Sequence, residues 1–401
     1  MLKKVLKGAG ATLGAIAIVS VVNSIFAYHV SRYEGVRFGK YYEYSGVIGV
    51  RTTYSDGSGS YATIGRICDS LGLHFAIIAD KNTVQPLRDS LDRRSGMTLI
   101  IPAVQMVVDN GGGSFLVVGD SIPLLPGNGI SADSVFRDAS RNGSLVILSR
   151  ETETGLHLSS GKSNESDYGG MELYNFHRSW KSMLSVFGVN KLFGTWLAGA
   201  LDSRSFNYVI QYPEKEMKEF DRVNRSRKVV GIGALGARSN IRLWNGTFWH
   251  YPSYETMFKL AHTVIVTTTP YNALYRHDRE LTLDAIKRGN SYVAFPGLEP
   301  ARGFLFTATS GNDEATMGDS LRLEGSATIR VSLPDSDYVE TQIVRNGETI
   351  GTYENEGSTT LTVKTAGIYR VQVFQERIML PFFIKRSYPW ILSNPIYVYK
   401  D

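Results

Sequence analysis

The chain has 401 residues, of which 43% are hydrophobic and 20% are charged, with a formal net charge of +5. This is the composition of a globular protein that buries a core, and the length is sufficient for two domains. The small net charge and the lack of basic runs with interleaved aromatic residues argue against nucleic-acid binding. A single cysteine, Cys68, and seven scattered histidines exclude a disulfide framework and a zinc–thiolate cluster.

Residues 1–30 predict a membrane anchor or a signal segment. Three lysines precede an uncharged apolar stretch, residues 8–27. A helix of this length spans about 30 Å, the thickness of the hydrocarbon core, and the lysines place its start in the cytoplasm. An uncleaved signal anchor and a signal peptide cleaved after Ala27 both fit. We favour the anchor because the apolar stretch is long for a signal peptide, and we expect a single-pass membrane protein whose bulk is exported, periplasmic or extracellular.

Between residues 31 and 300, short β-branched runs alternate with amphipathic stretches. The candidate strands are 44–50, 75–79, 98–107, 115–119, 144–148, 171–174, 229–234 and 263–268. The candidate helices are 61–71, 85–94, 130–140, 177–187, 214–225, 254–260 and 277–288. Alternation over this length predicts an α/β domain with a largely parallel sheet, closed or distorted into a barrel.

Residues 301–401 have a different pattern. Apolar and polar residues alternate with period two through 328–375, which is typical of strands, and the pattern is broken at Asn346-Gly347. These two residues tolerate the positive φ angles of a type I′ hairpin turn. We predict a C-terminal antiparallel β-sandwich of about 100 residues, which serves as a packing module rather than a ligand site.

Several segments resemble one known family, in order along the chain. They are "GVRTTYSDGSGSYATIG" from residue 49, "LIIPAVQM" from 99, "GGMELYN" from 169, "GIGALGAR" from 231 and "PWILSNPIYV" from 389. Together they resemble the polymerase and histidinol phosphatase (PHP) superfamily, including members with a C-terminal β domain. The resemblance implies a distorted (β/α)7 barrel. It also implies phosphoester hydrolysis by a cluster of divalent metal ions bound at the carboxyl ends of the strands.

The resemblance further implies which residues occupy the family's metal-ligand positions. The paired histidines correspond to Gly49 and Arg51, and the carboxylate of Ser-Asp-Gly is kept as Asp56. The other ligand positions correspond to residues that are basic or uncharged here: Lys81, Gln105, Ser114, Arg150 and Arg238. Most of the ligand set is therefore missing.

Basic side chains replace metal ligands at four of these positions: Arg51, Lys81, Arg150 and Arg238. Protonated Arg and Lys have no lone pair to donate to a metal, so we expect neither the family's metal cluster nor another cofactor. The nearby carboxylates are Asp56, Asp80 and Glu172. Two hypotheses remain open: a self-neutralised salt-bridge network, or a pocket that binds a small anionic ligand.

We therefore predict a catalytically inactive, membrane-anchored PHP-like protein of the cell envelope. It would act as a scaffold, as an assembly component with a protein partner, or as an anion-binding module. The alternative is an exported metal-dependent phosphoesterase with unusual ligands.

Overall fold

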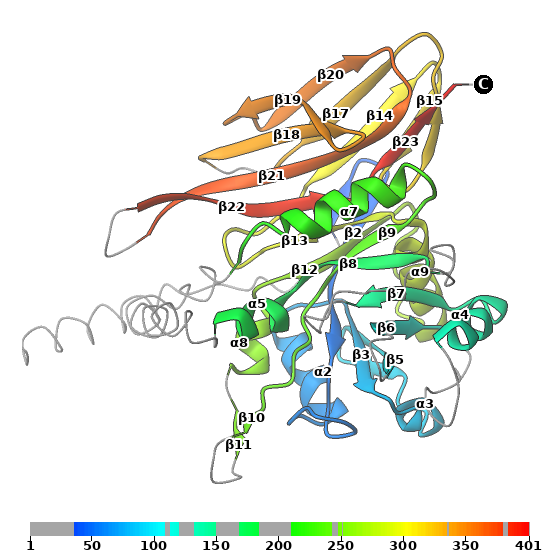
Figure 1. The fold of residues 1–401 in the computed structure, drawn as a ribbon, viewed down its shortest axis with the longest axis vertical. Helices are drawn as coiled ribbons and strands as arrows, with labels where there is room; N and C mark the ends of the chain where they lie inside the picture. The colour runs from blue at the N-terminus through cyan, green and yellow to red at the C-terminus, as the bar shows by residue number, and fades with distance from the viewer. Residues whose placement is uncertain are drawn as a thin grey trace, which may run out of the picture.

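The computed structural model describes residues 36–108, 113–119, 132–149, 168–183, 210–242, 248–250, 252–334, 337–379 and 384–400. Within these ranges the chain forms a mixed α/β fold with one large sheet, a four-stranded sheet and a two-stranded ribbon (Figure 1). The predicted anchor, residues 1–30, lies outside the described residues. No helix in the described ranges has both the length and the apolar composition needed to cross a membrane.

The large sheet contains the predicted strands together with others that the sequence did not predict. Its strands up to residue 294 are β1 (Val36–Phe38), β2 (Tyr41–Val50), β3 (Phe75–Lys81), β4 (Arg93–Ser95), β5 (Thr98–Val108), β6 (Gly113–Val118), β7 (Leu145–Ser149), β8 (Gly170–Asn175), β9 (Val230–Ala234), β12 (His262–Thr267) and β13 (Ser291–Ala294). All eight candidate strands correspond to one of these. The ribbon consists of β10 (Ile241–Arg242) and β11 (Phe248–Trp249).

The pairing of these strands is mixed rather than largely parallel. β2, β3 and β5 are parallel neighbours, and so are β7, β8 and β9. β6 runs antiparallel to both β5 and β7. Its direction relative to β5 follows from the connection between them, because four residues are too few for the crossover that a parallel strand needs. The segment after β9 returns to β2, where Leu235 N donates to Ile48 O at 2.9 Å and Ala237 N donates to Gly49 O at 3.1 Å. The carboxyl ends of β2 and β9 are therefore adjacent.

Helices occupy the connections between these strands. They are α2 (Tyr61–Ser70), α3 (Gln85–Arg88), α4 (Ala132–Arg141), α5 (Phe176–Met183), α7 (Glu214–Asn224), α8 (Tyr254–Phe258) and α9 (Tyr275–Arg288). α2 begins where the Ser60 side chain accepts a hydrogen bond from Thr63 N. The predicted helix 85–94 is wrong beyond Arg88, because Ser90 takes a positive φ of 50° that ends the helix and 93–95 pair with β5. The predicted end of the helix 177–187 lies outside the described residues.

From residue 305 onward the described chain contains only strands. They are β14 (Leu305–Ser310), β15 (Asp313–Thr316), β16 (Ser320–Arg322), β17 (Ala327–Ser332), β18 (Val339–Arg345), β19 (Glu348–Glu354), β20 (Ser358–Val363), β21 (Gly367–Met379), β22 (Ile384–Ser393) and β23 (Ile396–Tyr399). The four-stranded sheet has the order β15-β14-β17-β20. The other strands join the large sheet, since β22 pairs with β13.

This hydrogen-bonded junction ties the C-terminal strands to the α/β part (Figure 1). α7 adds a second contact, because its Asp221 carboxylate accepts from Arg370 Nε and Nη2 of β21 at 2.6 and 2.7 Å. Buried residues of both parts, such as Phe220 of α7 and Val371 of β21, belong to one hydrophobic cluster. The division into domains at residues 300 and 301 stays a prediction.

Candidate functional site

The loop that follows β2 forms the floor of the candidate site. Arg51 N donates to Ala237 O at 2.8 Å, which fixes the start of the loop to the segment after β9. The backbone N–H groups of Ser55 and Gly57 both donate to Thr52 O at 3.0 Å. A Cβ at residue 57 would lie 2.3 Å from Arg51 O, so the tight turn requires glycine at this position. The Ser-Asp-Gly sequence thus shapes a rigid turn that presents the Asp56 side chain.

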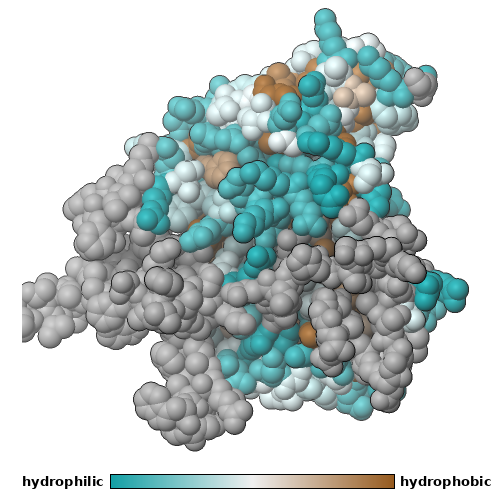
Figure 2. Space-filling model, in the orientation of Figure 1, coloured by the Kyte–Doolittle hydropathy of each residue, from teal (hydrophilic) through white to brown (hydrophobic). Residues whose placement is uncertain are grey.

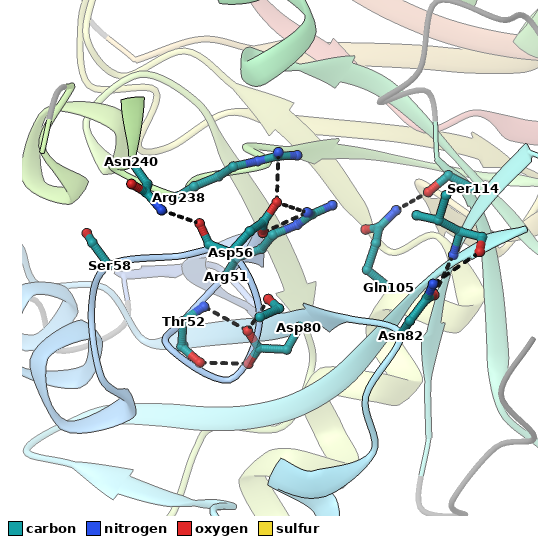
Figure 3. Close-up of polar contacts among 12 residues, drawn as sticks. Arg51, Thr52, Asp56, Ser58, Asp80, Asn82, Gln105, Ser114, Arg238 and Asn240 are labelled. Atoms are coloured by element: carbon teal, nitrogen blue, oxygen red, sulfur yellow. Dashed lines mark hydrogen bonds and ion pairs between the residues drawn. The ribbon is translucent and has the colours of Figure 1, made fainter. Parts of the chain in front are cut away.

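Asp56 binds two arginines, one 5 residues away in the sequence and the other 182 residues away (Figure 3). Arg51 Nη1 lies 2.8 Å from both carboxylate oxygens of Asp56, and Arg238 Nη1 lies 2.9 Å from Oδ2. The side chain of Arg51 is 2% exposed, that of Arg238 is 21% exposed and that of Asp56 is 39% exposed. The three side chains therefore form an ion-pair cluster that is buried on one side and open to solvent on the other.

Asp56 and Arg238 are both charged at neutral pH, although their surroundings shift the pKa of each. Burial alone would raise the pKa of Asp56, but the charges of Arg51, Arg238 and Lys81 lower it below the ordinary value of 3.8. Burial and the nearby Arg51 charge lower the pKa of Arg238 to about 10. Two guanidinium groups thus share one carboxylate, and this triplet carries one net positive charge.

Asp80 lies beneath the same loop and holds it by hydrogen bonds rather than by an ion pair. Its carboxylate, which is fully buried, accepts from Thr52 N at 2.8 Å, from Thr52 Oγ1 at 2.7 Å and from Ser55 Oγ at 2.6 Å. These bonds satisfy a buried charge that would otherwise be costly. Asp80 therefore acts on the shape of the loop that carries Asp56.

Two residues that sequence reasoning missed complete the cluster. The Tyr254 hydroxyl accepts from Ser58 N at 3.0 Å and Gly59 N at 3.2 Å, and it lies 2.8 Å from the carbonyl oxygens of Arg51 and Arg238. Asn240 Nδ2 donates to Asp56 O at 3.0 Å. Tyr254 lies about 200 residues from the loop, so no local sequence signal could have assigned it.

The remaining predicted residues are not all brought to Asp56. Lys81, at the end of β3, is exposed and acts on Asp56 through its charge. Gln105 Nε2 donates to Ser114 Oγ, and Figure 3 shows this pair apart from the arginine cluster. Glu172 accepts from Asn175 Nδ2 at 2.8 Å and lines a separate cleft. Arg150 lies outside the described residues.

The side chains at the arginine cluster do not fit a divalent metal ion. The carboxylate of Asp56 is held by two guanidinium groups, which would repel a cation and have no lone pair to offer it. Gly49, at the first expected histidine position, has a φ of 77°, a conformation that L side chains rarely adopt. The described residues contain no group of three or more His, Cys, Asp or Glu placed to hold a metal ion.

Comparison with known proteins gives a limited result. No family model and no curated protein match the chain. A crystal structure from Bacteroides vulgatus, of a two-domain protein described as containing a predicted PHP-like metal-dependent phosphoesterase, aligns at 12% identity with a TM-score of 0.42. The alignment covers 90% of this chain and 99% of the Bacteroides vulgatus chain. A candidate metal-dependent phosphoesterase from Bifidobacterium adolescentis aligns at 10% identity and a TM-score of 0.28, over 48% of this chain and 87% of that chain. Similarities this low assign no activity to the chain.

Proposed function

We propose that this chain is a degenerate PHP-like barrel with a C-terminal β-sandwich, catalytically inactive as a metallophosphoesterase, which serves as a scaffold or assembly component in a cell envelope. The single observation that carries the proposal is the pairing of Arg51 and Arg238 with Asp56 at 2.8 and 2.9 Å. Two guanidinium groups bind the carboxylate that, by the family resemblance, stands at a metal-ligand position. A side-chain cation supplies the charge that holds the loop, but it cannot activate a water molecule as a metal does.

The proposed barrel is supported by a contact between β2, near the start of the α/β part, and the segment that follows β9. The parallel bridge between Val50 and Ala237 and the hydrogen bonds beside it bring the segment after β9 to β2. The two arginines follow this contact directly, Arg51 after β2 and Arg238 after Ala237. The contact that would close a barrel is therefore the one that brings both guanidinium groups to Asp56.

The envelope location in this proposal is supported by the sequence of residues 8–27, an uncharged stretch with lysines on its N-terminal side. A chain anchored in this way presents its α/β part and its C-terminal strands outside the cytoplasm. Such a protein meets other envelope proteins, and a protein partner is part of the proposal. Co-purification of a stoichiometric partner after crosslinking in whole cells tests this part.

Metal content and phosphatase activity test the inactivity. The full chain is purified in detergent without a chelator, bound metals are measured by mass spectrometry, and p-nitrophenyl phosphate hydrolysis is followed before and after EDTA treatment. We expect no stoichiometric metal and no hydrolysis that EDTA removes. Stoichiometric zinc, manganese or iron, with hydrolysis that EDTA abolishes and metal restores, would establish the alternative, an exported phosphoesterase with unusual ligands. Hydrolysis that an Asp56→Asn variant retains would instead identify a contaminating enzyme or another site.

A second candidate function is binding of a small anion at the same cluster. It is favoured by the partial exposure of Asp56 and Arg238 and by the net positive charge of the triplet. Arg presents a planar fork that suits phosphate or carboxylate. Titration calorimetry with inorganic phosphate should show saturable binding that Arg238→Gln weakens and Arg330→Gln, a change at an exposed arginine of β17, leaves unchanged. Absence of heat in the wild-type chain would exclude this function.

A further inference from the structure

A second basic site lies far from the arginine cluster, at the junction between the α/β part and the C-terminal strands. A cleft of about 630 Å³ is bounded by the turn between α7 and β9, the hairpin between β18 and β19, and strand β23. This volume lies within the range of about 300–1,000 Å³ that is usual for small-molecule sites. Figure 2 shows a mainly hydrophilic face over α7 and the strands beside it.

Four basic residues line this cleft: Arg225, Arg227, Lys228 and Arg345. Among the described residues that line it, the only acidic one is Glu348, so these residues together carry a net charge of +3. Asp221 lies beside Gly347, but its carboxylate is bound by Arg370. The charge of the cleft is thus strongly one-sided, although the whole chain has a net charge of only +5.

Neutral oxygen atoms hold these basic side chains in place. Arg225 donates to the carbonyl oxygen of Asn346, and Arg227 donates to that of Tyr168. Lys228 Nζ donates to Ser320 Oγ at 2.6 Å. Arg345 Nη1 donates to Thr365 Oγ1 at 2.7 Å. These bonds orient the cations without neutralising them, and among the described residues none of the four forms an ion pair with a carboxylate.

Two aromatic rings also hold the side chains of Arg227 and Lys228 in place. The guanidinium of Arg227 lies 4.2 Å from the centre of the Tyr168 ring, and Lys228 Nζ lies 4.4 Å from the centre of the Tyr397 ring. Both contacts restrict the positions that the cationic groups of Arg227 and Lys228 can take.

The cleft and the arginine cluster lie at opposite ends of β9. Lys228 precedes β9 by two residues, whereas Arg238 follows its last residue, Ala234, by four. In Figure 1, α7 and β23 lie in the upper half of the molecule, and α2, which follows the Asp56 loop, lies in the lower half. The cleft is therefore a separate site, and its function does not depend on that of the cluster.

We propose that this cleft binds a small soluble polyanion that carries at least two phosphoryl groups. Three arginines and one lysine lining one recess exceed what a single phosphate needs, and their charges match a ligand with several adjacent negative charges. The recess is formed jointly by the α/β part and the C-terminal strands, so the ligand contacts both parts at once. Binding there would stabilise their junction.

Calorimetric titration with inorganic pyrophosphate at constant ionic strength tests the proposal on the full chain in detergent. We expect saturable one-to-one binding, tighter than that of inorganic phosphate, with an affinity that falls as sodium chloride is raised. Arg345→Gln and Lys228→Gln should each weaken the affinity about ten-fold, since each removes a charge-assisted hydrogen bond. The matched control is Arg330→Gln, which removes the same charge from β17, outside the cleft. It should leave the affinity within about two-fold of the wild type.

Three results would overturn the proposal. One is the absence of saturable heat with pyrophosphate at millimolar concentration. The second is an equal loss of affinity in Arg345→Gln and Arg330→Gln, which would indicate non-specific attraction to the net charge. The third is binding that Arg238→Gln abolishes and Arg345→Gln leaves intact, which would place the anion at the Asp56 cluster instead. Because Lys228 is exposed and Arg345 is partly exposed, both variants should keep the urea midpoint of the wild type, which verifies that they fold.

Discussion

Replacing Asp56 with asparagine tests whether the cluster stabilises the fold as an ion pair. The substitution keeps the size of the side chain and removes the charge that Arg51 and Arg238 share. Arg51 is then left as a buried guanidinium without this carboxylate, while Arg238 keeps more contact with solvent. The substitution removes no hydrogen bond of the turn itself, because Gly57 N and Ser55 N donate to Thr52 O and not to the Asp56 side chain.

The expected cost lies between two limits. Removing one partner of a fully buried ion pair costs about 3–5 kcal/mol, because the other charge is stranded. An exposed pair contributes at most about 1 kcal/mol. Arg51 is 2% exposed but Asp56 is 39% exposed, so solvent screens part of the interaction. We expect Asp56→Asn to lower the free energy of unfolding by about 2 kcal/mol.

Urea unfolding followed by tryptophan fluorescence measures this loss, with Asp92→Asn as the control, since Asp92 is exposed. The folded-state pKa of Asp56 is depressed, so its contribution is present above the ordinary value of 3.8 and is lost as the pH falls through the folded-state pKa. Wild type and variant should therefore converge at acid pH. Equal stability of Asp56→Asn and Asp92→Asn at pH 7 would refute the reasoning.

Two further predictions concern Glu43 and Gly57. Burial raises the pKa of Glu43 to about 7, against the opposing hydrogen bonds from Gly303 N and the Tyr292 hydroxyl, so the folded state holds this proton more tightly than the unfolded chain. The contribution of Glu43 to the free energy of unfolding should be greatest below pH 4.5. It should fall by about 3 kcal/mol as the pH rises through 7. Glu43→Gln should flatten this dependence in urea unfolding at several pH values, and parallel wild-type and variant curves would contradict it. Gly57→Ala places a Cβ 2.3 Å from Arg51 O and should lower the free energy of unfolding by about 1–3 kcal/mol. The control is Gly357→Ala, whose new Cβ has no atom within 4 Å and which should be tolerated. Thermal unfolding of both variants and the wild type measures the difference.

The sequence predicted the strands better than their directions. Runs such as 75–79 are apolar throughout and fully buried, and hydrophobic pattern alone identifies such runs. The direction of β6 depends on the length of its connection to β5, and the pairing of β12 with β2 depends on contacts between distant segments. The failure of the helix 85–94 came from a local backbone conformation at Ser90, which residue type does not encode.

The candidate site was predicted in part. Arg51, Asp56 and Arg238 were chosen for their place in the resemblance, and the structure brings them within hydrogen-bonding distance. Gln105 and Glu172 were chosen for the same reason, but they bond to Ser114 and Asn175 instead. Their roles as ligand-binding residues stay a prediction, as does that of Arg150.

The sequence by itself determined which charged residues stand at the positions that the resemblance assigns to metal ligands, the turn that needs Gly57 and the order of the α and β segments. These depend on residue type and local spacing. Only the tertiary structure decided that Arg238 reaches Asp56 and that Tyr254 binds the Asp56 loop, since these contacts join residues about 200 positions apart through the meeting of β9 with β2. It alone also gathered four basic residues from two parts of the chain around one cleft. Side-chain charge is a property of each residue, whereas the neighbours that neutralise it or leave it unbalanced are set by packing.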